Sequence, residues 1–188
     1  MCIRDSVRGV YPETQWLDVK PKEIEEPIDI VHICYPVSQP EQFEETTIAY
    51  VRRFNPKMVT IINSTVPPGT TNRIYQATKK PIVHSPIRGL HSSLKRHIFR
   101  FTKYIGAPKH EWAEMAKEHF ESLGIECHIC RSPLETEVGK ILDTTQYAYM
   151  IAFSQEMHRW CRELGADFNE AVIHFNICLL YTSDAADE

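Results

Sequence analysis

The chain has 188 residues, of which 43% are hydrophobic and 24% charged, a balance typical of one globular domain or of one domain with part of another. Its net charge of −4 gives no basic surface for nucleic acid, so we expect no nucleic-acid partner. Its apolar runs are far too short to span a bilayer, so we expect no membrane partner. Its cysteine usage leaves the cytoplasm as the default location.

Both ends of the chain read as the translation of a transposon-type sequencing adapter. The DNA that would encode residues 1–6 contains the reverse complement of the DNA that would encode the start of residues 178–188. Read-through at both ends of one DNA insert produces this pattern. We therefore expect both ends to be artefact and residues 7–177 to be the natural segment, cut where the DNA was cut.

The first half of the chain alternates strands and helices. Residues 28–35, 58–62 and 81–84 are short β-branched runs typical of buried strands. Apolar residues at helical spacing predict a helix over residues 41–54. A shorter helix, capped by Thr70 or Thr71, is predicted to run to about Thr78. This alternation predicts right-handed βαβ units in a parallel sheet.

Polar or proline-rich loops follow all three predicted strands, at residues 35–37, 63–65 and 85–89. The carboxyl ends of parallel strands meet at one edge of a sheet, and open α/β sheets bind their ligands there. The three loops therefore share one rim, which is the predicted site.

Two further strands and two further helices follow. Residues 102–106 and 125–130 read as strands, with an amphipathic helix over residues 109–123 between them. Cys127 and Cys130 have the spacing of a metal or redox pair, but no second pair accompanies them. Strand alternation explains them better, and we expect no metal.

A long helix is predicted from Pro133 to the residue before Gly165. Ser132 as the cap, Pro133 at the first helical position and Glu135 form a helix-start signature. Such a helix is roughly 48 Å long, and its apolar stripes predict contact with another domain or a partner subunit. A second helix is predicted to begin at residues 167–170.

Three blocks of the sequence resemble the UDP-glucose/GDP-mannose dehydrogenase family. Residues 61–71 (IINSTVPPGTT) are similar to the family's S-T-V-x-P-G-T-T loop, and residues 84–89 (HSPIRG) stand where the family has a strand ending in N/S-P-E. Residues 137–145 (EVGKILDTT), with Glu156 and residues 164–167 downstream, are similar to E-x-x-K-L-x-x-N followed by N-E and L-G-x-D. Order and rough spacing agree over residues 28–175.

The resemblance implies an α/β fold. Residues 7–131 would form the C-terminal half of a Rossmann-like parallel sheet that binds NAD, and residues 132–177 the long central helix of an α-helical dimerisation region. It also implies a homodimer formed through that helix. The implied reaction is the NAD-dependent oxidation of the C6 alcohol of a UDP- or GDP-sugar to the uronate, through a thiohemiacetal on a cysteine. The family's G-x-G-x-x-G motif and catalytic cysteine are absent from the sequence, so we expect this chain alone to be inactive.

The resemblance also implies roles for particular residues. Lys140 matches the active-site lysine, which contacts substrate and stabilises the developing oxyanion. Ser64 and Thr65 match the loop at the nicotinamide end, where Thr65 also helps to place water, and Tyr35 and Pro36 match the strand-end loop beside the cofactor. Each has a plainer explanation: an exposed helix lysine, a turn hydroxyl, or a strand end.

Two positions depart from the family pattern. Thr144 stands at the catalytic asparagine, and Ile87 stands at the carboxylate after the S-P step. Arg88, which follows, is either a bidentate ligand for a substrate phosphate or carboxylate or a surface arginine. Asp143 or Glu137 either supplies the lost carboxylate or is an ordinary helix-face charge.

Two other functions stay open. One is a hydroxy-acid-type NAD(P) dehydrogenase that uses Lys140 as a general base and needs no cysteine. The other is a non-catalytic Rossmann-like binding or oligomerisation module, which the two departures from the family pattern motivate.

Overall fold

The computed structural model describes residues 27–89 and 93–176, so the two adapter-like ends lie outside the described residues. The chain divides into two compact units, Met1–Ile141 and Leu142–Glu188. This division falls inside the long helix. Side chains from the first turns of that helix are buried in the first unit.

The first unit contains a three-stranded parallel sheet in the order β1 (Ile30–Ile33), β2 (Val59–Ile62) and β3 (Ile82–His84). The register pairs Ile33 with Ile62 and Ile62 with His84, so the three carboxyl ends lie level. The predicted parallel sheet is confirmed for these strands. β4 (Lys103–Ile105) and β5 (Cys127–Ile129) form a second parallel pair.

An antiparallel bridge between His84 and Gly106 joins β4 to β3. β4 therefore runs against the first three strands, and its first residue, Lys103, lies at their carboxyl ends. The alternation of the sequence gave no sign of this reversal, because strand direction depends on the path of the connecting segment.

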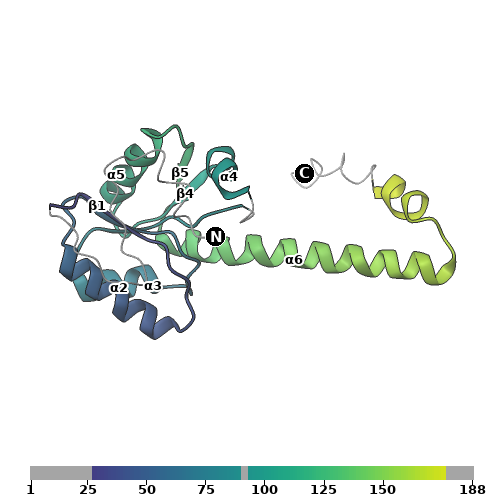
Figure 1. Cartoon of the computed structure of the whole chain (residues 1–188), viewed down its shortest axis with the longest axis horizontal. Coiled ribbons are helices and arrows are strands. Elements are labelled where there is room, and N and C mark those ends of the chain that lie inside the picture. The colour runs from purple at the N-terminus through teal and green to yellow at the C-terminus, as the bar shows by residue number, and fades with distance from the viewer. Residues whose placement is uncertain (1–26, 90–92, 177–188) are drawn as a thin grey trace. The chain divides into compact units, whose positions relative to one another are not determined.

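Helices cover both faces of the three-stranded sheet (Figure 1). α2 (Pro40–Phe54) and α3 (Thr70–Thr78) lie on one face and α5 (His110–Glu121) on the other. Alternate strand residues supply the two cores, since successive side chains point to opposite faces. Each fully buried large apolar side chain stabilises the fold by roughly 1.5–3 kcal/mol. The α2/α3 core includes Ile33, Phe43, Ile62, Ile74 and Ile82, and the α5 core includes Ile61, Val83, Ile105, Trp112 and Ala116.

The short helix α4 (Leu94–Arg100) was not predicted, because seven residues show too little periodicity. The long helix α6 (Pro133–Leu164) was predicted with its start signature, which is confirmed: the Ser132 hydroxyl accepts a hydrogen bond from Leu134 N at 3.2 Å. The helical turn η2 (Asn169–Ile173) follows in the second unit, where Asp167 Oδ1 accepts a bond from Glu170 N at 3.0 Å. Within residues 27–89 and 93–176, no helix is both long and apolar enough for a membrane span.

Candidate active site at the carboxyl ends of the strands

The predicted rim exists, and hydrogen bonds join its loops. The Ser64 hydroxyl donates to the Tyr35 carbonyl at 2.6 Å, which ties the loop after β2 to the loop after β1. The amide of Ile87 donates to the Asn63 carbonyl at 3.3 Å, which ties the loop after β3 to the same segment. The strand ends named from the sequence are therefore neighbours in space.

Tyr35 contributes to this rim through its backbone. Its hydroxyl lies 2.6 Å from the hydroxyl of buried Thr47, and its ring lies 4.9 Å from the Phe43 ring, both on α2. Burial raises the pKa of Tyr35 to about 12. The side chain therefore packs β1 against α2, which favours the strand-end explanation for it. Pro36 next to it is exposed.

Ser64 and Thr65 differ in what they offer a ligand. Ser64 is half-buried and its hydroxyl is already engaged by the Tyr35 carbonyl, so it behaves as a turn hydroxyl. Thr65 is exposed at the rim. Of the two, Thr65 is the one whose position leaves it open to a cofactor or to water.

A histidine that sequence reasoning missed connects this loop to α6. His84, at the end of β3, is fully buried; its Nε2 lies 3.1 Å from the Ser64 carbonyl and its Nδ1 lies 2.8 Å from the Thr136 hydroxyl. A carbonyl only accepts, so Nε2 carries the proton; the Thr136 hydroxyl, which donates to the Pro133 carbonyl at 2.9 Å, lies beside the unprotonated Nδ1. Burial lowers the pKa of His84 to about 4; the charge of Lys103 adds to the shift and the bond to Ser64 opposes it. The neutral ring therefore joins β3, the loop after β2, and α6.

We expect His84 to make the fold sensitive to acid. Its folded-state pKa lies below its ordinary value of 6.5, so the unfolded chain binds the proton more tightly. Its contribution is fully present above pH 6.5 and is lost as the pH falls towards 4, by roughly 3 kcal/mol in all. Urea unfolding of the wild type and of His84→Gln at a series of pH values isolates the contribution of His84 to the free energy of unfolding. Equal acid losses in the two proteins would contradict the assignment.

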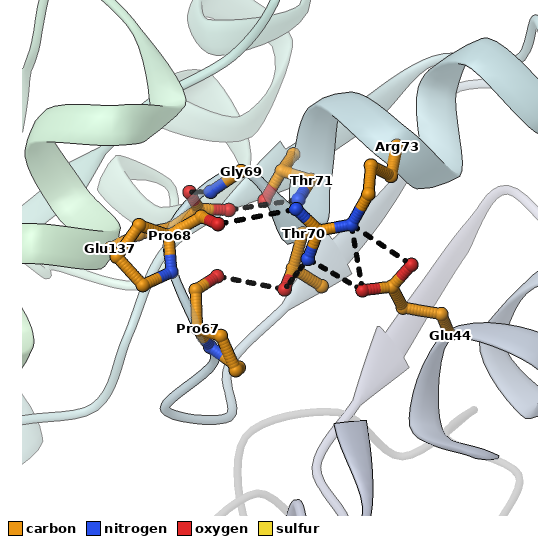
Figure 2. A network of polar contacts seen from close by, with 8 residues as sticks. All are labelled: Glu44, Pro67, Pro68, Gly69, Thr70, Thr71, Arg73 and Glu137. Carbon is orange, nitrogen blue, oxygen red and sulfur yellow. Dashed lines mark hydrogen bonds and ion pairs between the residues drawn. The ribbon is translucent and has the colours of Figure 1, made fainter. Parts of the chain in front are cut away.

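Glu137 is neither a replacement catalytic acid at the rim nor a charge on an exposed helix face. Only 1% of it is exposed, and its two carboxylate oxygens accept bonds from Gly69 N at 2.6 Å and Thr71 N at 2.8 Å (Figure 2). The predicted threonine cap of α3 is wrong. Thr70 and Thr71 lie inside the helix, whose N-cap is Gly69, and the Thr70 hydroxyl donates to the Pro67 carbonyl. Glu137 supplies the cap from α6.

Lys140 follows on the same side of α6. It is half-buried and lies three residues after Glu137 and four after Thr136, so the three share one helix face. Helical side chains lean towards the N-terminus of their helix, which directs Lys140 back towards the turn that contacts the loop. Thr144 and Asp143 are exposed and belong to the second unit.

Arg88 has a defined place at the rim. It is half-buried, and its guanidinium carbon lies 5.5 Å from the centroid of the Phe101 ring and 5.6 Å from that of the Tyr104 ring. Cation–π contact with these two rings holds the guanidinium at the rim. Ile87 beside it is half-buried and brings no acid–base group.

Lys103 is a second functional-site candidate that sequence reasoning missed. It is 8% exposed, and its Nζ donates to Asn63 Oδ1 at 3.2 Å and to the Ser85 carbonyl at 2.8 Å. Burial lowers the pKa of Lys103 to about 8. The signal was present, because Lys103 alternates in phase with buried Ile105 and so had to face the core. It ties the ends of β2 and β3 together.

The C-x-x-C spacing has no chemical partner group in the described ranges. Cys127 and Cys130 are free and half-buried at β5, as strand alternation predicted. Burial raises the pKa of Cys127 to about 11, which keeps it a thiol and a poor nucleophile at neutral pH. Over residues 27–89 and 93–176, no three His, Cys, Asp or Glu side chains gather in a way that suits a metal ion.

The chain is similar in sequence to known dehydrogenases, although no family model matches it. It is 32% identical over 115 residues to the UDP-N-acetyl-D-mannosamine dehydrogenase of Methanococcus maripaludis, covering 60% of this chain and 27% of that protein. The enzyme of the same name from Methanocaldococcus jannaschii is 31% identical over 116 residues, with 60% and 27% covered. The chain thus spans about a quarter of the length of these relatives.

Solved structures share the fold. A UDP-D-ManNAc dehydrogenase from Pyrococcus horikoshii superimposes with a TM-score of 0.66 at 20% identity, covering 79% of this chain and 40% of that one. A ternary complex of GDP-mannose dehydrogenase from Pseudomonas aeruginosa gives 0.62 at 18% identity, covering 80% and 39%. The chain is thus similar to nucleotide-sugar dehydrogenases in part of their sequence, and it shares a Rossmann-type fold with these structures.

Proposed function

We propose that the protein containing this chain is an NAD-dependent nucleotide-sugar 6-dehydrogenase, an oxidoreductase that converts a C6 alcohol to a carboxylate. One observation carries the proposal: α6 docks on the loop after β2, through Thr136 with His84 and through Glu137. Lys140 is the next residue on that helix face. In this proposal Lys140 lies beside the strand ends, where a cation stabilises the alkoxide and oxyanion that form as the alcohol is oxidised.

The residues at the rim fit the nicotinamide end of NAD. Exposed Pro36 and Thr65 follow adjacent parallel strands, at the edge where such sheets hold dinucleotides. When bound, NAD accepts the hydride from the sugar carbon. In this proposal Thr65 helps to orient water for the hydrolytic step, Arg88 binds an anionic group of the substrate, and Thr144 occupies the position of the family's asparagine. The phosphate-binding glycine motif and the nucleophilic cysteine are not in this sequence, so the proposal concerns the whole protein.

We propose UDP-N-acetylmannosamine as the substrate, because the curated relatives are named for it. The product is then a uronate of the kind used in polysaccharide synthesis. None of the four cysteines in the described residues forms a disulfide, which supports the cytoplasm as the place of action, since thiols stay reduced there.

The function is tested on the purified full-length protein by measuring NADH and product with UDP-N-acetylmannosamine, UDP-glucose and GDP-mannose. Oxidation of an alcohol to a carboxylate removes four electrons, so we expect two NADH per sugar. A single NADH, formed only with a hydroxy acid, would instead identify a two-electron dehydrogenase. If the folded protein forms no NADH with any of these substrates, the result would favour the non-catalytic binding or oligomerisation module.

We propose a homodimer formed through α6. Five large apolar side chains, spaced alternately seven and four residues apart, share one face of the helix within the second unit. An exposed apolar stripe of this kind marks an interaction surface. The five are Leu142 (60% exposed), Tyr149 (73%), Phe153 (65%), Trp160 (57%) and Leu164 (83%).

A charge placed on this stripe should dissociate the dimer. We expect Phe153→Glu to shift the full-length protein towards monomer in sedimentation velocity, because a buried unpaired carboxylate destabilises an interface strongly. Gln155→Glu adds the same charge on the opposite side of the helix and should leave the dimer intact. If both Phe153→Glu and Gln155→Glu sediment as dimers, as the wild type is expected to, this stripe is not the interface.

A further inference from the structure

We infer that Glu137 is a positioning residue: it fixes the loop after β2 against α6, and thereby sets Thr65 and Lys140 in their relative places. The inference rests on the proposed function and goes beyond it, because both carboxylate oxygens of Glu137 are engaged by backbone amides of the fold. Its evidence is the pair of bonds that its buried carboxylate makes to the start of α3 (Figure 2).

The side chains of α3 itself do not cap the start of the helix. The first turn of a helix leaves amide groups without intrahelical partners and carries a partial positive charge. α3 has no side-chain cap and no acidic residue in its first turn. Gly69 adopts a φ of 88°, a conformation that favours glycine. Its amide donates one of the two hydrogen bonds that the Glu137 carboxylate accepts. A carboxylate from another helix thus satisfies what the local sequence leaves open.

Bonds from α6 hold both ends of the segment of residues 64–71. At one end, Thr136 bonds to His84, which bonds to the Ser64 carbonyl. At the other end, Glu137 bonds to Gly69 and Thr71, five and seven residues further along. Two consecutive residues of one helix therefore fix residues 64–71 as a unit. Thr65 lies within that segment.

Lys140 lies one turn further along α6 on the same face. Any tilt of α6 against the segment changes the separation of Lys140 from Thr65. A displacement of about 1 Å from a change remote from the chemistry can lower turnover a hundredfold. Glu137 is thus placed to control the relative geometry of Thr65 and Lys140 through the segment that it holds.

The neighbouring pair Arg73 and Glu44 shows that Glu137 acts separately. The Arg73 guanidinium pairs with Glu44 at 2.6 Å and also donates to the Thr70 hydroxyl and the Pro68 carbonyl. Arg73 therefore supports the outer side of the same turn from α3 itself (Figure 2). Glu137, by contrast, links that turn to α6.

The experiment compares Glu137→Gln with Glu135→Gln in the full-length protein. Glutamine at 137 keeps one acceptor but turns a donor towards an amide. The same change at 135, on the more exposed side of the helix, keeps the capping pattern with Ser132, which glutamine also serves. Hydrogen exchange at Gly69 and Thr71 reports the contact itself, and kcat and KM report positioning, at a temperature where both variants are folded.

We expect Glu137→Gln to speed exchange at both amides and to lower kcat 10- to 100-fold, with KM for NAD changed less than about twofold. Glu135→Gln should change neither. If exchange is unchanged in Glu137→Gln, the contact does not exist in solution. If exchange is faster but kcat is unchanged, Glu137 only stabilises the start of α3. Either result overturns the inference. If the wild-type protein oxidises no nucleotide sugar, the proposed function is wrong. Faster exchange at Gly69 and Thr71 in Glu137→Gln would in that case still identify the contact.

Discussion

Replacing Lys140 with alanine is expected to lower kcat of the full-length protein by two to three orders of magnitude with nucleotide sugar and NAD. Loss of a group that stabilises an oxyanion has an effect of about this size. Lys140 is only half-buried, so the variant should lose less than about 1 kcal/mol of unfolding free energy. Steady-state kinetics and urea unfolding, measured on the same preparations, separate the two quantities.

Lys140→Arg is the matched control, because it keeps the charge and changes the shape of the donor. Partial activity in this variant would indicate that charge is the main requirement. If Lys140→Ala loses stability and activity in proportion, the lysine is an ordinary helix residue and the catalytic role is wrong.

Gly106→Ala is expected to be among the most destabilising single changes in the first unit. A Cβ at this position would lie 2.5 Å from the Ser132 carbonyl and 2.7 Å from Pro133 Cα, which are backbone atoms at the start of α6. It would also lie 2.8 Å from the Thr136 hydroxyl, which bonds to His84. Overpacking of this kind costs about 1–3 kcal/mol, and here it also pushes α6 from the rim.

Gly139→Ala provides the opposite case on α6. A Cβ there meets no atom within 4 Å, and alanine favours a helix over glycine by up to about 1 kcal/mol. Thermal unfolding should therefore show a lower Tm for Gly106→Ala and an equal or higher Tm for Gly139→Ala. A Gly106→Ala protein as stable as the wild type would show that α6 does not start against β4 in this way.

Local sequence patterns predicted much of the fold. β-branched runs gave β1, β2 and β3, and the Ser132, Pro133 and Glu135 signature gave the start of α6. Each of these features depends on neighbours along the chain. The reversal of β4 and the position of Lys103 at the rim depend on how the sheet continues beyond β3, which no local pattern encodes.

The site was predicted only where the loops themselves define it. The strand-end position of Ser64 and Thr65 followed from the βαβ pattern, whereas the turn of the Tyr35 side chain onto α2 did not. Glu137 shows the limit most clearly: the sequence suggested an ordinary helix-face charge or a spare catalytic acid. Its real partners, Gly69 and Thr71, lie more than sixty residues earlier in the chain.

The central claim is that Lys140 and Thr65 line one site beside the nicotinamide. A crystal structure of the full-length protein with NAD and a nucleotide sugar tests it most directly. We expect Lys140 Nζ at hydrogen-bond distance, about 3 Å, from the C6 oxygen, with the Thr65 hydroxyl on the same side of the nicotinamide ring. A sugar bound elsewhere, with Lys140 directed into solvent, would contradict the account.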